Sequence, residues 1–132
     1  MTKEEKQLLL KDLCARLPYG VKVMNKYKSQ TKTLSAVDIK NLVVRFYEND
    51  VNAPFGTHVE NPLKLYLQIK PYLRPISSMT EEESFDFGEV ILNATIEEVD
   101  KIDWLNEHHF DYRGLIEKGL ALEAPEGMYK EK

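Results

Sequence analysis

The side chains most capable of chemistry lie toward the C-terminus, where His108 and His109 are followed by Asp111 and preceded by Asp103 and Glu107. Helical ligands of a single metal usually lie three or four residues apart, as in HExxH. Adjacent histidines on a helix instead point about 100° apart. The helix dipole favours histidines at a helix C-terminus. We therefore interpret the pair as a helix end, and we predict no metal and no other cofactor.

No catalytic motif accompanies this cluster. The chain lacks GxSxG, P-loop and GxGxxG patterns. Its one cysteine, Cys14, lies on a predicted core stripe, whereas a reactive thiol needs an electropositive and partly exposed environment. Glu81 and Glu83 have the positions of exposed acids at a helix start, and a working acid–base pair needs a cleft and a perturbed pKa. The sequence therefore favours a protein that is not an enzyme.

Basic and tyrosine side chains recur through residues 19–71, a mixture that small β-barrels use to hold phosphates and stack bases. The candidate nucleic-acid contacts are Lys22, Lys26, Lys28, Arg45, Tyr47, Lys64, Tyr66 and Lys70. The competing interpretation is that outward-facing lysines protect the strands from pairing with other chains. The chain also has no RNP motif and a net charge of −4. Nucleic-acid binding is therefore the second hypothesis for function.

The leading hypothesis is a non-enzymatic interaction or regulatory protein whose partner is another protein. Trp104, Phe110, Tyr112 and Arg113 lie near one predicted helix end, and aromatic and arginine side chains often anchor protein interfaces. The same four residues could instead form a seam that attaches the C-terminal segment to its own domain. The sequence leaves both interpretations open.

The charge of the chain changes sign within residues 63–83. Residues 1–74 carry 13 Lys/Arg and 7 Asp/Glu, a net charge of +6, whereas residues 75–132 carry 5 and 15, a net charge of −10. The acidic part either packs beside the basic part or competes with a polyanion for it. We favour packing within the chain.

Residues 1–18 predict an amphipathic N-terminal helix. Thr2 and Glu5 have the spacing of a capping box, and Pro18 stops the helical pattern. The apolar stripe consists of Leu9, Leu10, Leu13, Cys14 and Leu17. Charged residues, among them Asp12 and Arg16, are expected mostly on the opposite face.

Residues 19–71 predict a β-unit with short strands near residues 21–23, 33–39, 42–47 and 63–69. The last of these alternates apolar and polar residues strictly, and it is the strongest strand prediction in the chain. Pro71 cannot donate to a sheet ladder, so this strand should end there or continue as an edge. Together these patterns predict a small antiparallel β-sheet or an SH3-like barrel.

Residues 72–132 predict a connector followed by an acidic helical tail. Residues 70–75 should form an extended connector, because each of its prolines biases the preceding residue away from helix. Thr80 and Glu83 have capping-box spacing for a short helix over residues 80–86, docked by Phe85 and Phe87 and broken by Gly88.

The remaining tail predicts a helix over residues 95–109 and a short helix over residues 112–118. Asp111 could cap the short helix, and Gly119 could end it. Residues 120–122 should pack onto the body, and residues 125–132 should fray.

The length of 132 residues predicts one α+β domain with an N-terminal helix, the β-unit and C-terminal helices. The chain has no apolar run of membrane-spanning length and no apolar signal-peptide region near its start. The single cysteine is compatible with a reducing compartment. We therefore expect a cytoplasmic protein without membrane contact.

Three segments of the chain resemble small uncharacterised proteins of Bacteroides-type gut bacteria and their phages, prophages and mobile elements. These segments are residues 4–23 (EEKQLLLKDLCARLPYGVKV), residues 70–83 (KPYLRPISSMTEEE) and residues 102–130 (IDWLNEHHFDYRGLIEKGLALEAPEGMYK), about half of the chain. The resemblance implies a bacterial or phage-encoded cytoplasmic accessory protein. It assigns no catalytic or binding residue.

Overall fold

The computed structural model describes residues 2–25, 30–38, 40, 43–46, 63–64, 69–92 and 98–129. The elements in chain order are helix α1 (Lys3–Arg16), 3₁₀ helix η1 (Leu17–Tyr19), strands β1 (Lys22–Asn25), β2 (Gln30–Asp38), β3 (Val43–Phe46), β4 (Leu63–Lys64) and β5 (Ile69–Leu73), 3₁₀ helix η2 (Ile76–Ser78), helices α2 (Glu81–Leu92) and α3 (Glu98–Glu107), and strand β6 (Leu122–Glu123). The predicted α+β class is confirmed.

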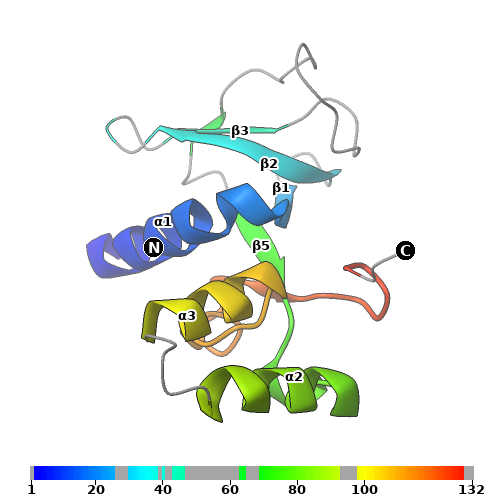
Figure 1. Ribbon diagram of the computed structural model, residues 1–132. Helices are drawn as coiled ribbons and strands as arrows, with labels where there is room; N and C mark the ends of the chain where they lie inside the picture. The colour runs from blue at the N-terminus through cyan, green and yellow to red at the C-terminus, as the bar shows by residue number, and fades with distance from the viewer. Residues whose placement is uncertain are drawn as a thin grey trace.

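The strands form an open mixed sheet in the order β4-β3-β2-β1-β5-β6. All neighbours are antiparallel except β5 and β6. Among the described residues β4 and β6 are the two edges, so the structure has the sheet rather than the barrel. In Figure 1, α1 lies between the β2–β3 part of the sheet and α3, and α2 lies farthest from these strands. Helix α1 therefore lies between the β2–β3 part of the basic β-unit and the two C-terminal helices.

The core forms where α1 packs against the sheet and the C-terminal segment. Leu9 and Leu13, one helical turn apart, are fully buried. They belong to a cluster that includes Val21, Val23, Leu34, Val44, Phe46, Ile69, Leu73, Leu115, Leu120 and Ala121. Burial of each Leu, Ile, Val or Phe side chain stabilises the fold by about 1.5–3 kcal/mol. The cluster draws on both ends of the chain, so the C-terminal segment is part of the core and not an appendage.

The predicted capping box of α1 is present. The Thr2 hydroxyl accepts from the backbone N–H of Glu5 over 3.0 Å, and the Glu5 carboxylate accepts from the backbone N–H of Thr2 over 2.8 Å. These two bonds satisfy amide groups that the first turn of a helix leaves without partners. They fix the start of α1 at Lys3.

Pro71 neither ends its strand nor lies in an edge strand, contrary to the sequence prediction. β5 runs through Pro71 to Leu73, between β1 and β6. β1 pairs with Ile69–Pro71 and β6 pairs with Tyr72 and Leu73, so in the described part of the chain Pro71 has a partner strand on one side only. A residue without an N–H is tolerated at such a locally unpaired side. The preceding residues 65–68, part of the strongest strand prediction, lie outside the described residues.

Helix α2 begins as predicted but is longer. The Thr80 hydroxyl accepts from the N–H of Glu83 over 3.1 Å, and the Glu83 carboxylate accepts from the N–H of Thr80 over 3.0 Å. The helix does not break at Gly88, because a helical glycine costs only about 0.5–1 kcal/mol relative to alanine. Phe85 does not dock the helix: its side chain is 69% exposed. The docking role belongs to Phe87, which contacts Trp104.

Helix α3 ends in a reverse turn centred on His109. The N–H of Phe110 donates to the carbonyl of Leu105 over 2.9 Å, and the N–H of His109 donates to the carbonyl of Asn106 over 3.1 Å. This pair of bonds defines a Schellman motif, in which the residue after the cap adopts a left-handed conformation. His109 has φ +62°, a position that glycine usually occupies. The turn directs the chain back along β5, where Phe110 bridges to Arg74 in parallel.

The segment after this turn forms a series of turns where a short helix was predicted. The Asp111 carboxylate accepts from the backbone N–H groups of Leu115 and Ile116 over 2.8 and 3.0 Å, so it binds the turn that follows it and does not cap the predicted helix. The residues that follow form turns rather than the predicted helix, and Gly119 ends them with φ +76°. The predicted packing of residues 120–122 is confirmed by the burial of Leu120 and Ala121.

The C-terminal segment does not fray from residue 125 as predicted, because Tyr129 bridges two strands. β1 and β5 pair through Val23 and Pro71, and the next residues along these strands are Lys22 and Tyr72. The Tyr129 hydroxyl accepts from the N–H of Lys22 over 2.8 Å and donates to the carbonyl of Tyr72 over 2.8 Å. The phenol thus continues the ladder where the two strands separate. Its ring stacks on His109, with centroids 3.8 Å apart.

Candidate interaction surface on helix α2

Helix α2 is attached to the end of β5 by a bidentate ion pair. The Arg74 Nη1 and Nη2 atoms donate to the two carboxylate oxygens of Glu83 over 2.7 and 2.6 Å. These hydrogen bonds from Arg74 hold the pKa of Glu83 well below its usual range, at about 2. Paired hydrogen bonds to a charged group are the stronger and more directional kind. The ion pair and the capping box share Glu83, so the start of α2 has a defined position relative to the sheet.

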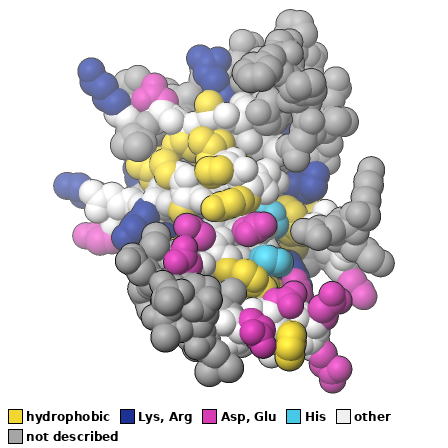
Figure 2. All heavy atoms as spheres, in the orientation of Figure 1, with side chains coloured by type: hydrophobic (Ala, Val, Ile, Leu, Met, Phe, Trp, Pro, Cys, Tyr) yellow, Lys and Arg dark blue, Asp and Glu magenta, His cyan; other side chains and the backbone are white. Residues whose placement is uncertain are grey.

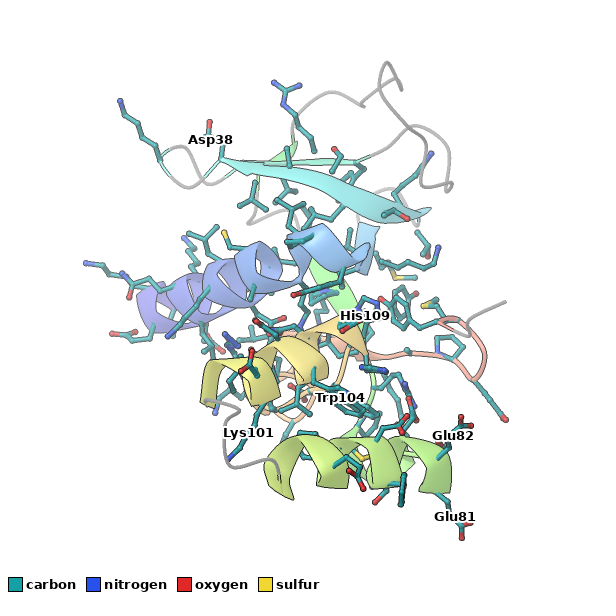
Figure 3. The ribbon with its side chains drawn as sticks, in the orientation of Figure 1. Asp38, Glu81, Glu82, Lys101, Trp104 and His109 are labelled. Atoms are coloured by element: carbon teal, nitrogen blue, oxygen red, sulfur yellow. The ribbon has the colours of Figure 1, made fainter. Side chains whose placement is uncertain are left out.

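An aromatic seam fixes α2 to α3. The Trp104 ring lies 4.9 Å from Phe87, 4.0 Å from His108 and 5.9 Å from Phe110, measured between centroids. The Arg74 guanidinium lies 4.2 Å from the centroid of Phe110. Figure 3 shows Trp104 pointing from α3 toward α2. The seam therefore joins β5, α2 and the end of α3.

Two residues of the predicted partner-binding group, Trp104 and Phe110, lie in this seam. Phe110 is fully buried, which assigns it to the interior of the chain and not to a partner surface. Trp104 is partly exposed and contacts three rings of its own chain, stacked on His108 and Phe110 and tilted against Phe87. The structure thus supports the alternative that the sequence had left open, a seam within the chain.

The other two residues, Tyr112 and Arg113, contact a buried polar network around Asp12. Arg16 donates from Nε to the Asp12 carboxylate over 2.9 Å and from Nη2 to the Phe110 carbonyl over 2.6 Å. Arg113 lies 3.5 Å from the same carboxylate and donates to the Tyr112 hydroxyl over 2.7 Å. Tyr112 and Arg113 therefore connect the C-terminal segment to α1.

Asp12 and Arg16 were expected on the polar face of α1, and this expectation is wrong. Both side chains are fully buried. Burial raises the pKa of the Asp12 carboxyl, against the opposing effect of the Arg16 guanidinium. The spacing of four residues between opposite charges was a visible signal of pairing on a helix. Their burial depends on residues about a hundred positions away and left no local signal.

The described members of the basic set are few. Lys22 and Lys70 share a face of the sheet, because Lys70 pairs with Met24, two residues beyond Lys22. Arg45 is exposed on β3. The structure does not describe the side chain of Lys64, and Lys26, Lys28, Tyr47 and Tyr66 lie outside the described residues. The arrangement shown therefore consists of two lysines on one sheet face and an exposed arginine on β3, two strands away from β1.

The outward side of α2 carries the most exposed large apolar side chain among the described residues. Phe85 is 69% exposed, and Ile76 in η2 follows at 45%. The neighbours of Phe85 on the helix surface are acidic: Glu81, Glu82, Asp86 and Glu89 are all exposed. We call this group, with Phe85, the α2 face. Figure 2 shows acidic side chains gathered over the end of the molecule where α2 lies, and Figure 3 shows Glu81 and Glu82 projecting from its first turn.

The histidine pair has roles within the fold. The His108 ring bonds through Nδ1 to the Trp104 carbonyl over 2.8 Å. His109 is 5% exposed, and burial lowers its pKa to about 3, helped by the nearby Arg16. In the described part of the chain, no three His, Cys, Asp or Glu residues are grouped to hold a metal. The half-buried thiol of Cys14 has a pKa raised by burial, which disfavours its reactive thiolate form.

The chain was compared with models of protein families, with curated proteins and with solved structures, and no match was found. Within the described ranges, no helix has the length and apolar character needed to cross a membrane. Since no similar protein suggests a function, the inference about function must come from the fold and from the α2 face.

Proposed function

We propose that this chain is a non-enzymatic interaction protein that binds another protein through the α2 face. The observation that carries the proposal is the position of Phe85, a phenylalanine 69% exposed at the centre of exposed carboxylates. Burial of a phenylalanine side chain contributes about 1.5–3 kcal/mol, and few residues of an interface supply most of its affinity. Phe85 is the apolar anchor of the proposed interface, and the carboxylates are its rim.

The way in which α2 is held supports this function. Arg74 binds Glu83, and Trp104 contacts Phe87, so both contacts use the inward side of the helix. The outward side is left to solvent along the described residues Glu81, Glu82, Phe85, Asp86 and Glu89. A surface whose backbone is already fixed loses less conformational entropy on binding. The α2 face is therefore preorganised for a partner.

Capture from bacterial lysate by the immobilised full-length chain tests the proposal. We expect that the wild-type chain retains a protein that Phe85→Ser loses. Ile76→Ser is the matched control, because among the described residues Ile76 is the exposed large apolar side chain that lies outside α2. Circular dichroism establishes that both variants are folded. Equal retention of the same proteins by Phe85→Ser and the wild type would contradict the proposal.

Nucleic-acid binding by the β-unit is the second candidate, favoured by the shared sheet face of Lys22 and Lys70. Phosphate contacts make affinity fall steeply as salt rises. We would titrate fluorescent single-stranded and duplex DNA at increasing salt with the wild type and with Lys70→Glu. Binding that is salt-sensitive and weakened by Lys70→Glu would favour this candidate, and no binding at low salt would remove it.

The proposal places this interaction in the cytoplasm of a bacterium, with a phage or mobile element as the source of the chain. Both parts rest on the resemblance of residues 4–23, 70–83 and 102–130 to proteins of such origin, and on the presence of one cysteine.

A further inference from the structure

We propose that Phe85 and Gly88 together receive a cationic α-helix of the partner, with Phe85 as a projecting side chain and Gly88 as the notch beside it. This inference rests on the proposed function and specifies the contact point and the chemistry of the partner. The observation behind it is that the described fold gives no reason for residue 88 to be a glycine.

Gly88 lies inside α2 and has no described conformational or packing reason to be glycine. Its φ is not in the left-handed region, where glycine is favoured. A Cβ placed on Gly88 would meet no atom within 4 Å among the described residues beyond its own helix backbone and its chain neighbours. An alanine would fit there and would favour the helix. A glycine that weakens a helix without improving the packing of the fold is the kind of residue expected at functional sites.

The spacing of the two residues matches the way in which helices pack. Residues three apart on a helix are neighbours on its surface, so Gly88 lies beside Phe85. A helix packs its ridges of side chains into the grooves of another helix. A glycine in a groove lets the partner backbone come close, while Phe85 supplies a ridge. The pair therefore suits a helix better than an extended strand, which would need exposed backbone groups for pairing.

The charge of the α2 face determines the chemistry of the occupant. Helix α2 contains five acidic residues and no lysine or arginine. One of the five, Glu83, is paired with Arg74, and the other four are exposed. A second copy docking through the same face would place like charges together, and nucleic acid would be repelled. The occupant is therefore a helix with lysines or arginines beside an apolar stripe.

A designed peptide tests this inference directly. The probe is a synthetic lysine–leucine peptide whose leucines form one helical stripe. Its control has the same composition in strict alternation, which is the pattern of a strand. Calorimetric titration of the full-length chain should show about tenfold tighter binding of the helical peptide. Equal binding of the two peptides would show that charge alone drives the association and would overturn the inference.

Gly88→Ala separates binding from folding. We expect a higher Tm, because alanine favours the helix, together with about tenfold weaker binding of the helical peptide, because the added methyl group fills the notch. Ser84→Ala is the matched control: it also favours the helix but adds no bulk, and Ser84 is exposed on α2. It should raise the Tm and leave binding unchanged. A Gly88→Ala chain that binds as tightly as the wild type would overturn the inference.

The variants Phe85→Ser and Gly88→Ala distinguish a partner that binds the α2 face from a partner that binds it with a helix. If Phe85→Ser abolishes capture of the partner while Gly88→Ala changes neither capture nor peptide affinity, the inference about a helix is wrong and the proposed function remains. If Phe85→Ser changes neither capture nor peptide affinity, the proposed function and this inference are both wrong.

Discussion

Arg16 and Asp12 form an ion pair that is fully removed from solvent, with the Arg16 Nε atom 2.9 Å from the Asp12 carboxylate. The same guanidinium donates to the carbonyl of Phe110, 94 residues away in the sequence. α1 is thus attached to the end of the α3 turn through charges and not only through apolar contacts. Removing one side chain of such a pair leaves the charge of the other buried without a counter-charge.

Asp12→Ala is therefore expected to destabilise the fold by about 3–5 kcal/mol, because it leaves the Arg16 guanidinium buried without its carboxylate. Chemical denaturation measures this loss. The double variant Asp12→Leu/Arg16→Met should recover much of it, since apolar residues of similar volume often replace buried ion pairs without loss. Additive effects of Asp12→Leu and Arg16→Met, each also measured alone, would show that the pair is not coupled.

The buried His109 predicts that stability falls as the solution is acidified. Its pKa is lowered from 6.5 to about 3, so the folded chain keeps it neutral while the unfolded chain protonates it below pH 6.5. The stabilisation is thus complete above pH 6.5 and is lost progressively between pH 6.5 and 3. The limiting slope is about 1.4 kcal/mol per pH unit.

The matched variant for this prediction is His109→Asn, because asparagine tolerates the left-handed conformation that His109 adopts. Denaturation at pH 7 and pH 5 should show a smaller loss of stability for this variant than for the wild type. The interval lies above the ordinary pKa of 4.5 of Glu83, so the Arg74 pair contributes little to the difference. The same pH dependence in both chains would contradict the assignment to His109.

The Arg74–Glu83 pair predicts that α2 can be loosened without unfolding the sheet. Glu83→Gln removes the charge that the guanidinium binds, although glutamine can still complete the capping box, at a cost of about 1–3 kcal/mol. Hydrogen exchange should accelerate in α2 much more than in β1. Glu82→Gln is the control, because Glu82 is an exposed neighbour on the same helix. Uniform acceleration over the whole chain would contradict a local role.

The features that the sequence predicted well are those whose cause is local. The capping boxes at Thr2 and Thr80 depend on residues three positions apart, and both are present. The apolar stripe of α1 depends on spacing within one helix, and its Leu9 and Leu13 are buried. Local spacing thus predicted the class of fold and two helix starts.

The features that the sequence missed depend on contacts between distant segments. The burial of Arg16 requires the Phe110 carbonyl, and the place of Pro71 inside the sheet requires β6. The exposure of Phe85 follows from the attachment of α2 through Glu83 and Phe87. A helical pattern shows which residues share a face, but tertiary contacts decide which face is inside. For this reason Trp104 and Phe110 were candidates for a partner surface, whereas the α2 face was not.

The hydroxyl of Tyr129 bridges β1 and β5. Tyr129→Phe keeps the ring stacked on His109 but leaves the N–H of Lys22 and the carbonyl of Tyr72 without this partner. Because unsatisfied backbone groups are costly when sheltered from water, the substitution should destabilise the fold by about 1–3 kcal/mol. The Lys22 amide should also exchange faster with solvent, and Leu34, whose amide bonds to Val21, is the internal reference. An unchanged unfolding midpoint with an equally protected Lys22 amide would show that the C-terminal segment is held by β6 and the stacked ring alone.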